Sequence, residues 1–254
     1  MGNDLTKAQH AAIEEAAAIW REARCPIAST GAGISVPSGI PDFRSPGGLW
    51  EKHDPAEVAT LQALRSRPAR VWEFLFDALD IFANAAPNPA HTALAELERT
   101  GRLAAVITQN IDGLHQAAGS RNVIEFHGNS TRLYCMRCKR DHDAARITTL
   151  PSADRPWECE CGGVVRPDIV FFGEQIPRDA MTRSFAVAQE ADLVIVVGTS
   201  GEVAPANTIP ATVKARGGKM IEVNLGPSTF GTMADVAIRA GCEAVLPALA
   251  KRLM

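Results

Sequence analysis

The chain has 254 residues, 46% hydrophobic and 22% charged, which is the composition of a folded globular protein and excludes a disordered or fibrous chain. Its formal net charge of −3 leaves no basic excess, so no nucleic-acid partner is expected. No stretch approaches the roughly 20 apolar residues that span a bilayer, so no membrane partner is expected either.

The N-terminal region lacks the features of a signal peptide, so we expect a cytoplasmic protein. Met1–Thr6 matches the N-myristoylation pattern, but so short a pattern arises easily by chance and one acyl chain anchors only weakly. Residues 7–23 have the apolar spacing of an amphipathic helix, and Pro26 prevents its continuation. A short apolar strand is expected at Pro26–Thr30.

Similar apolar runs recur downstream and alternate with helical patterns. Further strands are expected at Leu103–Thr108, Asn122–Phe126, Asp168–Phe172, Leu193–Val197 and Met220–Val223. Helices are expected at 89–100, 177–190 and 206–216. This alternation predicts an α/β fold with a doubly wound parallel sheet.

Three segments lie outside the alternation. Residues 34–50 contain several Pro and Gly residues without hydrophobic periodicity, which predicts a long loop of the kind that is usually functional or mobile. Residues 56–86 are expected to form two helices divided near Pro68. Residues 129–165 hold four cysteines but no long apolar run, so apolar burial alone does not explain how they fold.

The four cysteines have the spacing of a metal site. Cys135-x2-Cys138 and Cys159-x-Cys161 are separated by twenty residues and supply four thiolates for one tetrahedral zinc ion. Because four thiolates leave no position for water, the zinc is expected to be structural. Two alternatives stay open: His142 replaces one ligand of the tighter second pair, or the cysteines are buried without a metal.

Glycines follow the first predicted strand. Gly31-Ala32-Gly33 resembles the start of a dinucleotide fingerprint, in which glycines let the backbone approach a pyrophosphate. Val36 and Pro37 stand where dehydrogenases have a small residue that opens a helix, so a conventional dehydrogenase is disfavoured. Taken alone, the glycines fit an ordinary tight turn equally well.

Polar residues follow the ends of other predicted strands. They are Thr108–His115, Gly198-Thr199-Ser200 and Asn224. Ligands bind at the carboxyl ends of parallel strands in open α/β sheets, so the three positions together favour a nucleotide site. His127, after the strand expected at 122–126, is a candidate base, although a lone histidine is more often structural.

The motifs occur in one order: Gly31-Ala-Gly-Ile-Ser, Gly39-Ile-Pro-Asp-Phe-Arg44, Thr108-Gln-Asn-Ile-Asp112, His127-Gly, the four cysteines, Phe172-Gly-Glu174, Gly198-Thr-Ser200 and Asn224. Together they resemble the sirtuin family of NAD-dependent protein-lysine deacylases, over about residues 25 to 250. The resemblance implies a Rossmann-like NAD-binding domain, expected at residues 1–36, 87–128 and 166–254. The smaller domain would comprise the cofactor loop and helical module, 37–86, and the zinc-binding module, 129–165.

The resemblance implies NAD and zinc as cofactors and acylated-lysine proteins or peptides as partners of a monomer. The cofactor-binding residues would be Gly31, Ala32, Gly33, Asp42, Phe43, Arg44, Gln109, Asn110, Asp112, Gly198, Thr199, Ser200, Asn224 and Cys242. The catalytic residues would be His127, as general base, and Asn110. Substrate backbone would pair with Val170, Phe171, Phe172 and Gly173 as an added strand. The zinc ligands would be the four cysteines.

The implied reaction is deacylation, chiefly deacetylation, of protein lysines, with release of nicotinamide and O-acyl-ADP-ribose. A protein ADP-ribosyltransferase or an NAD hydrolase on the same fold also begins by releasing nicotinamide, and it stays as the alternative. A non-enzymatic reader is disfavoured because Asn110, Asp112 and His127 are all present.

The helical module also bears on acyl selectivity. Family members that remove succinyl or malonyl groups carry a Tyr-x-x-Arg pair there, whereas this sequence has Leu75 and Ala78 at the corresponding places. An apolar pocket that favours neutral acyl groups is therefore expected. The alternative is that Arg65, Arg67 or Arg70 reaches the pocket instead.

Overall fold

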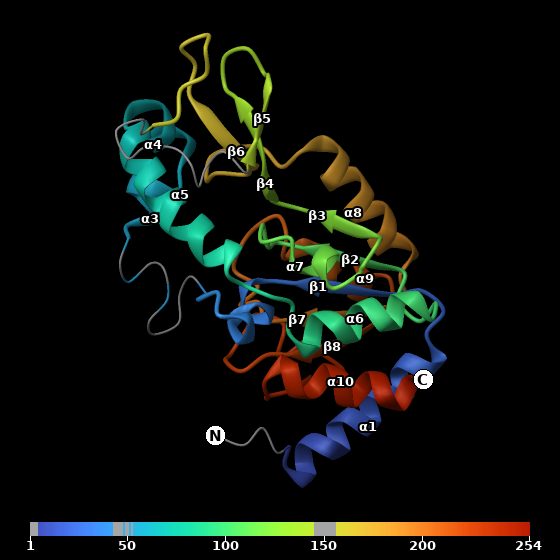
Figure 1. The fold of residues 1–254 in the computed structure, drawn as a ribbon. Coiled ribbons are helices and arrows are strands. Elements are labelled where there is room, and N and C mark those ends of the chain that lie inside the picture. The colour runs from blue at the N-terminus through green and yellow to red at the C-terminus, as the bar shows by residue number, and fades with distance from the viewer. Residues whose placement is uncertain (1–4, 43–47, 49–50, 52, 145–155) are drawn as a thin grey trace.

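The computed structural model describes residues 5–42, 48, 51, 53–144 and 156–254. A six-stranded sheet with helices on both faces forms the larger part, and a region of helices and antiparallel strands lies at one end of it (Figure 1). The strand order is β3-β2-β1-β7-β8-β9, and all neighbours are parallel. The doubly wound α/β fold expected from the sequence is confirmed.

The large sheet has β1 and β7 at its centre, with the other strands on either side of them. The strands are β1 (Pro26–Thr30), β2 (Ala105–Thr108), β3 (Val123–Glu125), β7 (Leu193–Val197), β8 (Lys219–Val223) and β9 (Val236–Ile238). The chain adds β2 and β3 on one side of β1, and β7, β8 and β9 on the other. The strand order therefore reverses between β1 and β7, which is where open α/β sheets bind ligands.

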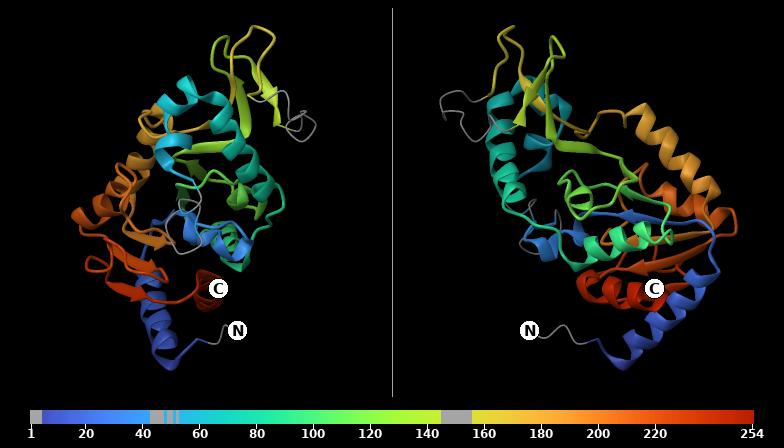
Figure 2. Two further views of the ribbon diagram at one scale, coloured as in Figure 1. Left: turned by 90° about the vertical axis from the view of Figure 1, so that its left-hand side faces the viewer. Right: turned by 45° about the vertical axis from the view of Figure 1, so that its right-hand side comes forward.

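Helices cover both faces of this sheet (Figure 2). They are α1 (Lys7–Glu22), α6 (Pro89–Arg99), α7 (Leu114–Ala117), α8 (Arg178–Glu190), α9 (Thr208–Ala215) and α10 (Cys242–Leu253). Ile195 and Val197 pack into the core shared with α1, α6 and α10. Val194 and Val196 pack into the core shared with α8 and α9, because successive side chains of a strand point to opposite faces. Burial on both faces explains why these strands read as unbroken apolar runs.

The smaller region joins helices and strands around a third core. Its helices are α3 (Pro55–Val58), α4 (Leu61–Ser66) and α5 (Pro68–Ala83), and its antiparallel strands, in the order β5-β4-β6, are β4 (Gly128–Cys135), β5 (Asp141–Asp143) and β6 (Val165–Ile169). Trp72 of α5 is buried in this core, and its Nε1 donates a hydrogen bond to the carbonyl of Val165 at 2.9 Å. The helical module and the strands of the cysteine segment thus share one core.

One expectation about the strands is wrong. The run at Asp168–Phe172 was expected in the parallel sheet, but β6 ends at Ile169 and pairs antiparallel with β4. Of its apolar residues, Phe171 is buried in the third core, Ile169 and Val170 are partly buried, and Phe172 is exposed. The two helices expected at residues 56–86 are three in the described structure, and Pro68 opens the third. Among the described residues, no helix is both long and apolar enough to cross a bilayer.

Candidate functional site

A cavity of about 1350 Å³ lies beyond the carboxyl ends of the central strands, between the large sheet and the smaller region. This volume exceeds the roughly 300–1,000 Å³ of ordinary small-ligand pockets, so a dinucleotide and a second ligand fit together. The predicted cofactor, catalytic and substrate residues within the described ranges all line it: Gly31, Ala32, Gly33, Asp42, Gln109, Asn110, Asp112, His127, Val170, Phe171, Phe172, Gly173, Gly198, Thr199, Ser200, Asn224 and Cys242. Phe43 and Arg44 lie outside the described residues.

The ends of β1 and β7 approach each other backbone to backbone. A Cβ on Gly33 would lie 2.7 Å from the Cα of Gly198, and Gly198 itself has φ +63°. Only glycine fits both positions without moving the strands. In the described structure the N–H groups of Ala32 and Thr199 have no hydrogen-bond acceptor, and such groups bind phosphate oxygens. These observations fit a bound pyrophosphate.

Side chains from the ends of β2 and β8 converge on Thr199, which follows β7. Gln109 Nε2 donates to its Oγ1 and Asn224 Nδ2 donates to its carbonyl, both at 3.3 Å. Cys242, at the first position of α10, has its Sγ 3.8 Å from the carbonyl oxygen of Gly33. Burial, with the charge of Glu243, raises the pKa of this thiol to about 12, so Cys242 is a neutral packing group beneath the glycine turn.

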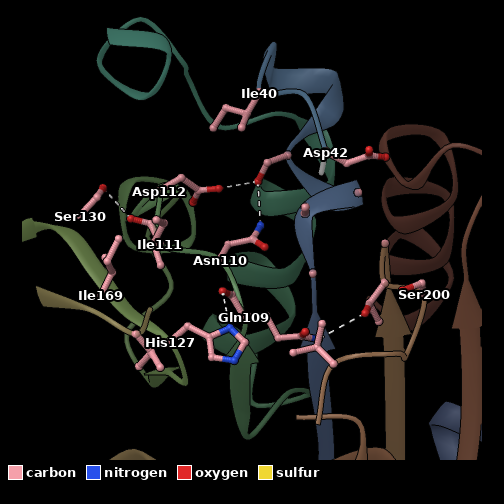
Figure 3. A pocket seen from close by; sticks show the side chains of 18 of the residues that line it. Ile40, Asp42, Gln109, Asn110, Ile111, Asp112, His127, Ser130, Ile169 and Ser200 are labelled. Atoms are coloured by element: carbon pink, nitrogen blue, oxygen red, sulfur yellow. Dashed lines mark hydrogen bonds between the residues drawn. The ribbon is translucent and has the colours of Figure 1, made fainter. Parts of the chain in front are cut away.

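Asn110 and Asp112 are joined by a serine, as Figure 3 shows. The Ser35 hydroxyl accepts a hydrogen bond from Asn110 Nδ2 at 3.0 Å and donates one to Asp112 Oδ2 at 2.7 Å. Ser35 is buried, and the second oxygen of Asp112 accepts from the N–H of Leu114 at 2.9 Å. The amide and the carboxylate are therefore fixed relative to each other before any ligand binds.

The loop that carries these residues is anchored on both sides. Gln109 N–H donates to the carbonyl of Thr30 at 2.9 Å, and the hydroxyl of Ser130 on β4 donates to the carbonyl of Ile111 at 2.7 Å. Asn110 N–H donates to the hydroxyl of Thr108 at 3.1 Å. Backbone and side-chain bonds from both parts of the molecule thus hold the loop in place.

Two buried histidines lie behind the loop. His115 Nε2 is 2.9 Å from the hydroxyl of Thr30, and the rings of His91 and His115 meet edge to face at 4.9 Å. Burial lowers the pKa of His115 to about 3, aided by the charge of His91, and burial lowers that of His91 to about 4 despite Asp112. Both imidazoles are therefore neutral in the native protein at neutral pH.

His127 lies in the cavity between the two parts of the molecule. Its Nδ1 is 3.1 Å from the carbonyl oxygen of Gln109. Because a carbonyl only accepts, Nδ1 carries the proton of the neutral ring and Nε2 keeps its lone pair. Burial lowers the pKa of His127, and the Gln109 bond only partly opposes this. The neutral, proton-accepting form is therefore the one present at neutral pH.

The predicted substrate segment, residues 170–173, follows β6 directly. Phe172 is tied to the turn between α3 and α4: its N–H donates to the carbonyl of Ala59 at 2.8 Å, and its carbonyl accepts from the N–H of Leu61 at 3.1 Å. The main chain of Phe172 is thus already paired within the protein. It is not available to a substrate strand.

The rest of the segment is only partly paired. Val170 N–H donates to the carbonyl of His127 at 2.9 Å, and Phe171 exchanges bonds with the carboxylate and the N–H of Glu174, both at 2.9 Å. In the described structure the groups left without a partner are the carbonyl of Val170 and the N–H and carbonyl of Gly173. Within residues 170–173, a bound peptide backbone can therefore pair only at Val170 and Gly173.

One end of the cavity is apolar. Helix α5 contributes Phe74, Leu75, Ala78, Leu79 and Phe82 to its lining. The three arginines that the sequence left open do not line the cavity. Arg67 pairs with Glu57 at 3.5 Å. Arg70 pairs with Glu73 at 2.9 Å, and Arg65 lines an adjoining groove.

The four predicted zinc ligands come together away from the cavity. The Sγ atoms of Cys135 and Cys161 are 3.5 Å apart, those of Cys138 and Cys159 are 3.8 Å apart, and all four lie within 4.8 Å of one another. Zinc–sulfur bonds of about 2.3 Å in a tetrahedron place sulfurs about 3.8 Å apart, so the group fits zinc. His142 is not in the group; its ring packs edge-on against Trp157 at 5.2 Å.

Two residues of the site, Ser35 and Ser130, were not predicted from the sequence. Ser35 stands at the end of the Gly31 motif but received no role, because its link to residues 110 and 112 exists only in three dimensions. Ser130 was placed in the cysteine segment, yet its hydroxyl supports the cavity loop. A polar residue next to a glycine motif was the only sequence signal for Ser35.

Known proteins resemble this chain over most of its length. A model described as "Sir2 family" matches residues 31–205. The chain is 50% identical over 224 residues to an NAD-dependent protein deacetylase of Sulfurisphaera tokodaii, covering 87% of this chain and 88% of that one. It is 48% identical over 245 residues to an NAD-dependent protein deacylase of Thermococcus kodakarensis, covering 95% of each.

Solved structures give the same likeness. One, described as bearing on the mechanism and regulation of Sir2 enzymes, has a TM-score of 0.90 and 41% identity, covering 96% of this chain and 98% of that one. A Sir2 variant with a deacetylated peptide and 3′-O-acetyl ADP-ribose has a TM-score of 0.88 and 40% identity. The match covers 95% of this chain and 97% of that one. A Sir2 homologue–NAD complex has a TM-score of 0.86 and 40% identity, covering 94% and 93%.

Proposed function

This chain belongs to the Sir2 family, and we propose that the cavity at its sheet ends is the site where acyl groups leave protein lysines. The chain is an NAD-dependent protein-lysine deacylase, chiefly a deacetylase, whose products are nicotinamide and O-acyl-ADP-ribose. The observation that carries the site assignment is that the predicted cofactor, catalytic and substrate residues line one cavity.

NAD, when bound, supplies a ribose carbon that carries nicotinamide as its leaving group. We assign its pyrophosphate to the N–H groups of Ala32 and Thr199. The nicotinamide amide belongs with Asn110 and Asp112: since Ser35 takes the Asn110 amide nitrogen, the amide oxygen of Asn110 is left to accept a bond from the ligand. This arrangement supports binding that is both tight and oriented.

His127 acts as the general base in this proposal. Its Nε2 accepts a proton from a ribose hydroxyl, while the bond from Nδ1 to Gln109 fixes the tautomer and the ring orientation. The lowered pKa supports the role, because the base is unprotonated at neutral pH. The substrate peptide pairs with the free main-chain groups of Val170 and Gly173 as an added strand.

We further propose a cytoplasmic monomer without a nucleic-acid partner, divided at the boundaries expected from the sequence except that residues 166–171 go with the smaller region, because β6 pairs with β4 and Phe171 lies in the third core. The unpaired state of the described cysteines supports a reducing compartment. The described exposed large hydrophobic residues are few, and three of them, Val36, Phe172 and Leu225, line the cavity. A large apolar patch of the kind that marks a subunit interface is therefore not seen on the described surface.

The test is incubation with NAD and an acetyl-lysine peptide, followed by mass spectrometry of the products. We expect equal amounts of deacetylated peptide, nicotinamide and O-acetyl-ADP-ribose. An ADP-ribosylated peptide, or free ADP-ribose formed without deacetylation, would instead identify a transferase or an NAD hydrolase. The His127→Ala variant serves as the control for contaminating activity.

A further inference from the structure

A second groove, of about 620 Å³, lies beside the cavity between α4 and the substrate segment. Phe172 and Gly173 line both spaces, so the groove continues the cavity. Phe172 is 49% exposed, although phenylalanine is usually buried, and Gly173 keeps its main-chain groups unpaired in the described structure. A peptide bound at Val170 can therefore continue into the groove.

Arg65 of α4 lines this groove and is exposed. Within the described structure it has no ion-pair partner within 4 Å, whereas Arg67 and Arg70 of the same module are paired with glutamates. The charge of Arg65 acts on Glu174. Burial opposes ionisation of Glu174, but the bonds from Arg166 and the Phe171 N–H, with the charge of Arg65, lower its pKa.

The carboxylate of Glu174 is already occupied. Both of its oxygens receive bonds from Arg166, and one also receives the N–H of Phe171. Two guanidinium groups, Arg65 and Arg166, therefore stand against one carboxylate and leave a net positive charge of one beside the groove. This local sign is opposite to the net charge of the whole chain, which is −3.

We infer that the groove is a subsite for an acidic side chain of the substrate, two or three residues from the acylated lysine. The inference rests on the proposed function of the cavity. An extended chain advances about 3.3 Å per residue, and the segment turns where the Glu174 N–H bonds to the Phe171 carbonyl, so Val170 and Gly173 are at most about 10 Å apart, which two or three peptide residues span. A glutamate suits the groove, since its methylenes lie on Phe172 and Leu61 while its carboxylate reaches the guanidinium of Arg65.

The experiment compares acetyl-lysine peptides that differ in a single residue, Glu, Gln or Lys, at each position from −3 to +3. KM and kcat are measured at low and at physiological salt. For one of the positions two or three residues away, we expect the Glu peptide to have a KM about two- to five-fold below that of the Gln peptide. Exposed ion pairs have effects of this size, and salt weakens them. The value of kcat should not change.

Variants separate Arg65 from general electrostatics. Arg65→Gln should remove the preference for Glu, and Arg65→Glu should reverse it in favour of Lys. Arg70→Gln is the matched control, because Arg70 is an exposed, paired arginine of the same module outside the groove. It should keep the preference of the wild type. Equal KM values of the wild type for the Glu, Gln and Lys peptides would overturn the inference. So would a preference for Glu that is unchanged in Arg65→Gln.

A binding titration with fluorescent peptides of the same series distinguishes this inference from the proposed function. Charge discrimination in binding that depends on Arg65 supports the subsite even where turnover is absent. Turnover without charge discrimination leaves the deacylase intact and eliminates the subsite.

Discussion

Arg166, which is buried, and Glu174, which is partly buried, form a two-pronged ion pair that encloses the substrate segment. Arg166 Nη1 lies 2.5 Å from Glu174 Oε1 and Nη2 lies 2.8 Å from Oε2, and the Arg166 side chain is 3% exposed. The same guanidinium donates to the carbonyl of Ile169 and stacks over the ring of Phe171 at 4.6 Å. The pair thus fixes the backbone on both sides of Val170.

Glu174→Gln should therefore destabilise the protein and weaken peptide binding. Removing one partner leaves the Arg166 charge buried, which costs about 3–5 kcal/mol. We expect a lower free energy of unfolding in urea and a raised KM for the peptide, with a smaller change in NAD affinity. The double variant Arg166→Met, Glu174→Leu should recover stability but not peptide affinity. Full peptide affinity in either variant would show that the pair has no positioning role.

His127→Ala should lower deacetylation by about 10²- to 10⁴-fold, the usual contribution of a positioned general base. NAD binding, measured by calorimetry, should persist, because the glycine turns and Thr199 are untouched. In the wild type the active form of His127 is neutral and its pKa is below the ordinary 6.5, so kcat should be flat near pH 7 and fall only in acid. Near-normal turnover of the variant at saturating NAD would contradict the assignment.

His91 and His115 should make stability depend on pH. Their folded pKa values, about 4 and about 3, lie below the roughly 6.5 of an unfolded histidine. Between these values the unfolded chain binds protons that the native chain does not, so the free energy of unfolding falls as pH falls below 6.5. For His91, the free energy of unfolding should fall by about 3 kcal/mol between pH 7 and pH 4.

The check is urea unfolding of the wild type and His91→Gln at pH 7 and pH 5. The variant should have a lower free energy of unfolding than the wild type at pH 7. Its free energy of unfolding should fall by less than that of the wild type between pH 7 and pH 5. An identical pH dependence in the two proteins would show that His91 does not titrate with unfolding.

Zinc should be present at one equivalent per chain, and chelation should unfold the smaller region first. Cys135 and Cys159 belong to the core that also contains Trp72, so losing the metal loosens the packing of α5 as well. Elemental analysis and hydrogen exchange should show metal loss together with lost protection in β4, β6 and α5, while β1 and β7 stay protected. Cys25→Ser, outside the cluster, is the control and should keep its metal. Fully active protein without metal would refute the assignment.

Acetyl-lysine peptide should be used at least tenfold more efficiently than its succinyl counterpart. Leu75 and Ala78 are buried in the cavity lining, and no arginine of the helical module within the described residues lines it with them. An unpaired carboxylate there costs several kcal/mol. Leu75→Tyr with Ala78→Arg should narrow the ratio of kcat/KM values. Equal use of the two peptides by the wild type would place a cation at the acyl end after all.

The sequence predicted elements best where one physical cause dominates. Burial on both faces makes β7 an unbroken apolar run and β1 a run of small and apolar residues, and the bounds of both strands agree with expectation. Helix α10 was missed because Pro247 interrupts its pattern. Strand β4 was missed because exposed and polar residues fill much of it. Strand β6 was assigned to the wrong sheet, because a short apolar run does not reveal which neighbour covers it.

The site residues also differ in whether a local sequence pattern could predict them. The cysteine cluster follows from spacing, since four thiolates close in sequence have few other uses. The glycine turn and the strand-end amides follow from fold topology. Ser35, the Arg166–Glu174 pair and the unpaired groups of Val170 and Gly173 depend on contacts between segments far apart in the chain, which no local pattern encodes.

The pairing of β4 with β6 has a mechanical consequence. Gly128 stands opposite Ile169, so His127 and Val170 occupy neighbouring ends of one strand pair, while Cys135 stands opposite Val165 at the far end. The Val170 N–H also donates to the His127 carbonyl, so the two residues would stay side by side in a hinge rotation between the two parts of the molecule. The distance between His127, the proton acceptor, and a peptide bound at Val170 is therefore set within one pair of strands. This distance need not change when ligands enter and leave.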